Sequence, residues 1–210
     1  IADGFVQAAR KFPDRPALEV DGAVVAYSEL FERASAIAST IAKLTTSEAS
    51  PLVAVFAYRS VTAFAGVLGV LMAGRGYVPL NRHFPGDRTR SMLQRSRSRV
   101  IVTDVESEPQ LPDLVNAYSD ELVVLLPDRE NVGDYSRRFA QHKFLGSREL
   151  QRARERDIAT NVNGQSLAYL LFTSGSTGVP KGVMVTQSNV RRYLDSMTHR
   201  YEITEHDRCS

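Results

Sequence analysis

The sequence predicts an α/β protein in which layered sheets are flanked by helices. Short, almost wholly apolar runs alternate with amphipathic runs of helical length, a pattern typical of strand–helix–strand units. Several of the apolar runs are of the kind that is buried on both faces of a parallel sheet. The chain has 210 residues, of which 43% are hydrophobic and 24% charged, so it is long enough to bury a large core.

The first elements expected are a hairpin and a helix. Residues 17–20 and 24–27 are joined by Asp21-Gly22, which supplies positive φ angles at low cost and therefore predicts a tight β-turn. Ser28 is expected to cap a helix with a single apolar stripe that packs on a sheet. The stripe consists of Leu30, Phe31, Ala34, Ile37, Ala38, Ile41 and Leu44.

A buried strand and a second helix follow. Leu52–Phe56 is almost wholly apolar, and Ser60 is a candidate cap for a helix over 61–72 that ends at Gly74. The next strand, 77–80, contains Pro79, which has no N–H to donate and should mark a strand end or a sheet edge.

The second half of the chain continues the alternation. Its expected elements are a helix at 87–95, strands at 100–103, 122–126, 167–172 and 183–185, and a closing helix that Ser188 caps. Residues 128–163 are polar and weakly periodic, which predicts a loop with a short charged helix at 148–156.

Composition excludes several classes of partner. The 26 Lys and Arg against 24 Asp and Glu leave a formal net charge of +2, so neither a nucleic-acid partner nor an anionic membrane is expected. Five arginines cluster without interleaved aromatic residues, which indicates a solvated helix face. They are Arg88, Arg90, Arg95, Arg97 and Arg99.

Targeting and cysteine signals are also absent from the sequence. Cys209 is the single cysteine, so no internal disulfide can form, and the four histidines lack metal-ligand spacing. The start of the chain resembles no signal peptide, and the apolar stretch 61–73 is too short to span a bilayer. A cytoplasmic location is the expectation.

A glycine- and hydroxyl-rich loop directly after the strand at 167–172 carries the candidate chemistry. Its glycines allow successive N–H groups to point into one concavity, its hydroxyls add donors, and its lysine adds a charge that can reach a terminal phosphate. The candidate phosphate-binding residues are Thr173, Ser174, Gly175, Ser176, Thr177, Gly178 and Lys181. From composition alone, a flexible surface loop is an equal alternative.

The P-loop of nucleotide triphosphatases does not fit this segment. That motif places Gly before the lysine and Ser or Thr after it, followed by a helix. Here Pro180 precedes Lys181, Gly182 follows it, and no helix is expected directly after the lysine.

The stretch from Tyr169 to Val183 instead resembles the phosphate-loop signature of the adenylate-forming (ANL) superfamily. That superfamily contains the amino-acid adenylation domains of nonribosomal peptide synthetases, the acyl- and aryl-CoA synthetases and luciferase. The segments 12–18, 26–30, 71–80, 84–88 and 92–93 are similar to the opening of a peptide-synthetase adenylation domain. The resemblance covers most of the chain and is weakest between residues 104 and 163.

The resemblance implies an ATP-dependent ligase. Such enzymes join a carboxylate to the α-phosphate of ATP, release pyrophosphate, and pass the acyl group to a thiol such as the phosphopantetheine arm of a peptidyl carrier protein. Ser176 and the run 73–80 favour an amino-acid substrate. Asn81 and Gln187 depart from that pattern, so an acyl- or aryl-CoA synthetase stays open, as does a truncated, non-catalytic nucleotide-binding module.

The same resemblance implies that residues 1–210 are the N-terminal portion of the large subdomain of an adenylation (AMP-binding) domain. No linker or boundary signal precedes Ser210. The substrate pocket, the Mg²⁺ ligand and the catalytic lysine are therefore expected beyond that residue. No catalytic residue is expected within the 210 residues, which should be inactive alone.

Overall fold

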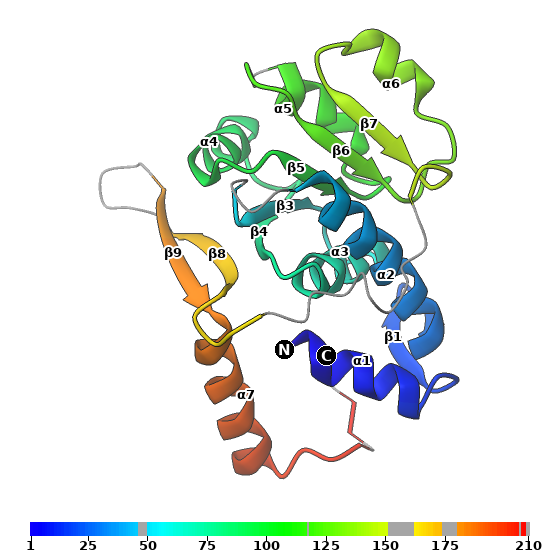
Figure 1. Ribbon diagram of the computed structural model, residues 1–210, viewed down its shortest axis with the longest axis vertical. Helices are drawn as coiled ribbons and strands as arrows, with labels where there is room; N and C mark the ends of the chain where they lie inside the picture. The colour runs from blue at the N-terminus through cyan, green and yellow to red at the C-terminus, as the bar shows by residue number, and fades with distance from the viewer. Residues whose placement is uncertain (46–49, 117, 151–161, 174–179, 206, 209–210) are drawn as a thin grey trace.

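A seven-stranded sheet forms the centre of the described protein (Figure 1). The computed structural model describes residues 1–45, 50–116, 118–150, 162–173, 180–205 and 207–208. The strand order is β7-β6-β5-β3-β4-β8-β9, in which all neighbours are parallel except β8 and β9. The strands are β3 Leu52–Phe56, β4 Gly76–Leu80, β5 Val100–Thr103, β6 Val123–Leu126, β7 Lys143–Gly146, β8 Leu167–Thr173 and β9 Lys181–Thr186.

Helices cover both faces of this sheet (Figure 1). Because side chains alternate along a strand, Val53 and Val55 pack with one helical layer, whereas Ala54 and Phe56 pack with the other. The first layer holds α2 (Tyr27–Leu44) and α3 (Val61–Met72), with α1 (Ala2–Lys11) outside it. The second holds α4 (Gly86–Ser96), α5 (Leu111–Asn116) and α6 (Gly133–Arg138), and a 3₁₀ turn, η1 (Glu108–Gln110), precedes α5.

The connections define a doubly wound topology. Helix α3 leads from β3 to β4 over one face, and α4 leads from β4 across β3 to β5 over the other. The order β4-β3-β5-β6-β7 is therefore the flavodoxin-like 2-1-3-4-5 order. Its switch point, where the outgoing loops diverge to opposite faces, lies between the carboxyl ends of β3 and β5.

The predicted hairpin is confirmed. Strands β1 (Pro16–Val20) and β2 (Ala23–Ala26) pair antiparallel, and the φ angles of Asp21 and Gly22 are 50° and 79°, both positive as the tight turn requires. Helix α2 buries the predicted residues Leu30, Ala34, Ile37, Ala38 and Ile41.

Of the three predicted helix caps, one is right. Ser60 Oγ accepts a hydrogen bond from Ala63 N at 3.0 Å. Ser28 is not a cap, because α2 already begins at Tyr27 without a side-chain cap. Ser188 is not one either: Thr186 caps α7 (Gln187–Tyr201), and the side chain of Asn189 returns to Thr186 N at 3.0 Å in a capping box.

Residues 128–163 contain more structure than their weak periodicity predicts. Helix α6 and strand β7 form there, held by the rings of Tyr135, Phe139 and Phe144, whose centroids lie 5.3 to 6.2 Å apart. Residues 148–150 form a turn, so the predicted helix does not begin at Arg148, and 151–156 lie outside the described residues. These elements depend on aromatic contacts that a local pattern does not reveal.

Three smaller expectations have clear outcomes. Pro79 is the penultimate residue of β4, as expected for a strand end, but β4 is an interior strand and not an edge. Arg95, Arg97 and Arg99 are exposed as predicted, whereas Arg88 is half-buried over the Phe84 ring and Arg90 is also half-buried. No helix among the described residues has both the length and the hydropathy to cross a membrane.

Gly69 sets the distance between α2 and α3, and this predicts opposite outcomes for two Gly→Ala substitutions. A Cβ at Gly69 would lie 2.7 Å from Ala34 O, so Gly69→Ala should destabilise the protein by about 1–3 kcal/mol. Gly4→Ala in α1 meets nothing within 4 Å and should instead stabilise by up to about 1 kcal/mol through helix propensity. Urea unfolding of both variants measures the difference; equal effects would contradict this account of the helix packing.

Candidate phosphate-binding site

The predicted phosphate-binding loop connects β8 to β9 at the tip of a hairpin. Thr173 and Lys181 form the last pair of the ladder, and Thr173 Oγ1 donates to Lys181 O at 3.4 Å. Directly opposed residues of an antiparallel pair project to the same face, so the hydroxyl and the ammonium group stand together at the mouth of the loop, both exposed. The intervening candidates Ser174, Gly175, Ser176, Thr177 and Gly178 lie outside the described residues.

The hairpin is anchored on one side and open on the other. Leu170 is buried in the core and Phe172 packs against the same cluster, whereas Leu171 and Val183 on the opposite face are 43% and 49% exposed. Thr173 and Lys181 belong to this open face, because side chains alternate along each strand. A ligand can therefore approach both residues without displacing the core.

The loop leaves the sheet at the edge where α/β proteins bind ligands. Strand β8 runs parallel to β4, which it meets at the pair Tyr77–Tyr169, so its carboxyl end lies at the same edge as those of β3, β4, β5 and β6. This position agrees with a ligand-binding role for the loop.

A P-loop is excluded by the structure after the lysine. Strand β9 begins at Lys181, where a Walker motif would begin a helix. A phosphate held here therefore meets side chains and loop N–H groups, without the dipole of a helix starting at the lysine.

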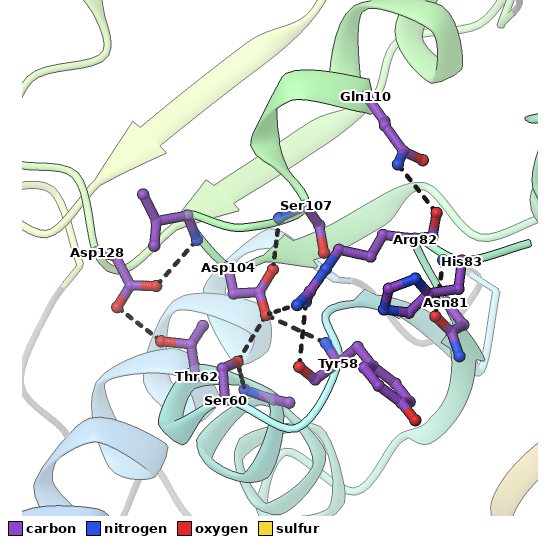
Figure 2. Close-up of polar contacts among 12 residues, drawn as sticks. Tyr58, Ser60, Thr62, Asn81, Arg82, His83, Asp104, Ser107, Gln110 and Asp128 are labelled. Atoms are coloured by element: carbon purple, nitrogen blue, oxygen red, sulfur yellow. Dashed lines mark hydrogen bonds and ion pairs between the residues drawn. The ribbon is translucent and has the colours of Figure 1, made fainter. Parts of the chain in front are cut away.

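A polar cluster at the same edge was missed by the sequence analysis (Figure 2). Asp104, which follows β5, is fully buried. Its Oδ2 accepts from Ser60 Oγ at 2.6 Å and from Tyr58 N at 3.1 Å, and its Oδ1 accepts from Ser107 N at 2.9 Å. Arg82 after β4 completes the charge balance, with Nη1 3.9 Å from Oδ2.

Arg82 links this cluster to the neighbouring loops. Its Nη1 donates to Tyr58 O at 3.2 Å, and its own carbonyl accepts from Gln110 Nε2 at 2.9 Å. Asp104 and Arg82 therefore join the segments after β3, β4 and β5, and they occupy the switch point between β3 and β5 with the chain's own groups. The signal in the sequence that could have revealed this cluster is an acidic residue, Asp104, directly after the buried strand 100–103.

Asn81, one of the two departures from the peptide-synthetase pattern, has a local role. Its Oδ1 accepts from His83 N at 2.9 Å, a turn in which an aspartate could serve equally well. Either residue fits this backbone turn. The presence of Asn81 in place of aspartate therefore carries little information about the substrate.

A second buried carboxylate lies nearby, at the start of η1. Glu108 forms an ion pair with Arg129 Nε at 2.5 Å. Three effects together raise the pKa of Tyr135 to about 12: burial is the largest, and the negative charge of Glu108 and its hydrogen bond to the phenol add to it. Neutral Tyr135 is thus part of the packing that holds α6.

Metal ligation finds no support in this part of the protein. The described residues contain no group of three or more His, Cys, Asp or Glu side chains that could hold an ion.

Comparison with known proteins shows the family of this chain. The family model described as "AMP-binding enzyme" matches residues 5–209, and the chain belongs to that family. Bacitracin synthase 2 of Bacillus licheniformis is 30% identical over 204 residues, and a dimodular nonribosomal peptide synthase of Bacillus subtilis is 32% identical over 208 residues. The crystal structure of the Vibrio cholerae adenylation domain AlmE in complex with glycyl-adenosine-5'-phosphate superposes with a TM-score of 0.82 at 23% identity.

These relatives are much longer than the chain. The matches cover 97% and 99% of this chain but 7% and 8% of the two synthases, and 98% of this chain but 38% of AlmE. The similarity therefore concerns one portion of larger proteins.

Removal of the Asp104 carboxylate should strongly destabilise the fold. Asp104→Ala leaves Tyr58 N and the Ser60 hydroxyl without their acceptor, removes one of the two acceptors of Ser107 N and breaks the buried ion pair with Arg82, which should cost about 3–5 kcal/mol. Asp120→Ala is the control, because Asp120 is 57% exposed in its pair with Arg99 and should cost less than about 1 kcal/mol. Chemical denaturation decides; a small loss in Asp104→Ala would contradict the structural role of the cluster.

The raised pKa of Tyr135 predicts a specific loss of stability at high pH. The unfolded chain loses the phenolic proton near its ordinary pKa of 10, while the folded protein retains it to about 12. The contribution is therefore complete below pH 10 and is lost as pH rises to 12. Tyr135→Phe should flatten the fall of the unfolding free energy over that interval, whereas Tyr201→Phe, at an exposed position, should not. Identical slopes for all three proteins would refute the prediction.

Proposed function

We propose that the chain supplies the phosphate-binding part of an enzyme that activates an amino acid as its acyl-adenylate, using ATP and releasing pyrophosphate. The observation that carries the proposal is the pairing of Thr173 with Lys181 at the mouth of the loop, on the open face and at the carboxyl edge of the sheet. The acyl group would then pass to the phosphopantetheine thiol of a peptidyl carrier protein.

The chemical task of the loop is electrostatic. When a substrate carboxylate attacks the α-phosphorus and the bond to the bridging oxygen breaks, negative charge accumulates on the leaving pyrophosphate. Lys181 would supply a counter-charge, and the hydroxyls of Thr173, Ser174, Ser176 and Thr177 would donate hydrogen bonds. Gly175 and Gly178 would let the loop backbone approach the phosphates. Donors fixed by a strand ladder need little reorganisation during the reaction.

An amino acid is the preferred substrate class. The relatives include a protein named as a nonribosomal peptide synthase, matched over 99% of this chain, and Ser176 agrees with the peptide-synthetase form of the motif. Product analysis of the parent protein distinguishes this proposal from the acyl- or aryl-CoA synthetase alternative. A carrier-bound thioester supports the proposal, and a free CoA thioester refutes its amino-acid part.

We further propose that residues 1–210 are the N-terminal portion of the large subdomain. The matched share of the solved AlmE chain, 38%, agrees with a chain that is one portion of a longer domain. The catalytic lysine, the substrate pocket and the Mg²⁺ ligand would lie in the remainder, where the ion would neutralise part of the phosphate charge. Turnover by the 210-residue chain alone would refute this division.

Lys181→Ala in the longer parent protein should impair the use of ATP. Loss of one charge-assisted contact costs about 1.5–3 kcal/mol, so kcat/KM for ATP in amino-acid-dependent pyrophosphate exchange should fall roughly 10- to 150-fold. Lys143→Ala, at an exposed position of β7 remote from the hairpin, is the matched control and should be unchanged. A change confined to the KM for the amino acid would show that Lys181 does not bind phosphate.

A further inference from the structure

A polar cavity lies at the edge of the sheet opposite the phosphate loop. It is formed where α4 ends and β5 begins, together with the connection from α5 to β6, so it adjoins the amino ends of β5 and β6. Its volume is about 380 Å³, which falls within the range of roughly 300–1,000 Å³ for pockets that bind small organic molecules. The described residues that line it are Gln94, Arg97, Arg99, Tyr118, Ser119 and Asp120.

Tyr118 gives the cavity a rigid wall. Its hydroxyl donates to Ser98 O at 3.2 Å. Its carbonyl accepts from Gln141 Nε2 at 3.3 Å, and its N–H donates to Val115 O at 3.1 Å. Because the ring and the backbone are both tied to the fold, a ligand would meet a preformed surface and would not have to order it on binding.

His142 fixes both ends of the same connection. Its Nε2 lies 3.0 Å from Val115 O near the end of α5, and its Nδ1 accepts from Leu122 N at 3.2 Å just before β6. Ser119 and Asp120 lie in the chain between these two contacts. The fold therefore holds them beside the cavity.

Arg97 supplies the cavity with a positive charge from a strained backbone position. It follows the last residue of α4 with φ 54° and ψ 26°, the left-handed conformation that glycine or asparagine usually adopts at a helix end. The side chain is exposed, and among the described residues no carboxylate pairs with it. A bulky residue in a conformation that favours glycine indicates a role for its side chain.

Arg99 adds a second guanidinium group at the same cavity. It forms an ion pair with Asp120 at 2.9 Å, in which the two side chains are 50% and 57% exposed. An ion pair this exposed contributes little free energy, so an incoming anion can share Arg99 with Asp120. Guanidinium groups match the oxygens of a phosphate with two parallel hydrogen bonds each.

We propose that this cavity binds a small organic phosphate monoester. Arg97 and Arg99 would hold the phosphate group, and the organic part would lie in the cavity against Tyr118. A phosphate monoester carries a charge of about −1.5 to −2 at neutral pH, which suits two guanidinium groups better than the single charge of a carboxylate does.

The cavity is separate from the site proposed for the phosphates of ATP. Arg97 and Arg99 precede β5, at the amino edge of the sheet, whereas Thr173 and Lys181 lie at the carboxyl edge. The proposal therefore does not require the proposed adenylation activity.

Ligand-observed NMR of phenyl phosphate with the longer parent protein tests the proposal. The measurement is made in the Lys181→Ala background, so that Lys181 cannot supply the binding. Saturable binding is expected for phenyl phosphate and not for phenol. Arg97→Gln should weaken it at least tenfold, because a charge-assisted contact is lost, whereas Arg137→Gln, at an exposed position of α6, should leave it unchanged.

A second substitution at the same position separates binding from folding. Glycine adopts the left-handed conformation without strain, so Arg97→Gly should keep or raise Tm while it abolishes binding. A lower Tm together with lost binding would assign Arg97 to the stability of the fold and overturn the proposal.

Four other outcomes also overturn it. One is the absence of saturable binding, and another is equal affinity of Arg97→Gln and Arg137→Gln for phenyl phosphate. Phenol binding as tightly as phenyl phosphate would show a cavity that selects the ring alone. Poly-glutamate binding as tightly would assign the cavity to an acidic peptide. Since turnover is not measured, failure here is distinguishable from failure of the proposed function.

Discussion

The carboxylate of Asp104 lies where the loops after β3, β4 and β5 meet, and the shape of this sheet edge depends on it. It accepts hydrogen bonds from Tyr58 N, Ser60 Oγ and Ser107 N while Arg82 balances its charge. A buried carboxylate is tolerated only when its oxygens are paired in this way. The same hydrogen bonds therefore offset the free-energy cost of burying the carboxylate, and they fix the geometry of the three loops relative to one another.

Asp104 and its partners also decide where a ligand can bind at this edge. A flavodoxin-like strand order places the usual ligand site at the switch point between β3 and β5, which here is occupied by Asp104 and its partners. The candidate phosphate site lies instead beyond β4, on the β8–β9 hairpin. Because β9 begins at Lys181, the ammonium group of that residue would meet phosphate charge without the dipole of a helix that starts at the lysine.

The β8–β9 hairpin is held by the core along its inner strand only. That strand contributes Leu170 to the core, whereas the outer strand continues into α7, of which only Gln187 is buried. Membership of the AMP-binding enzyme family and the short matched share of each relative agree with the proposal that residues outside the 210 complete the phosphate site.

The sequence alone determined the elements whose signals are local, namely the Asp21-Gly22 turn, the apolar strands, the Ser60 cap and the stripe of α2, and it also indicated the family. Contacts between distant residues decided the rest. Aromatic packing formed α6 and β7, and Asp104 acquired its partners only when the loops after β3, β4 and β5 met. The ladder likewise brought Thr173 opposite Lys181. Local periodicity reports the face that a segment buries, whereas only the assembled sheet determines which polar groups meet at its edge.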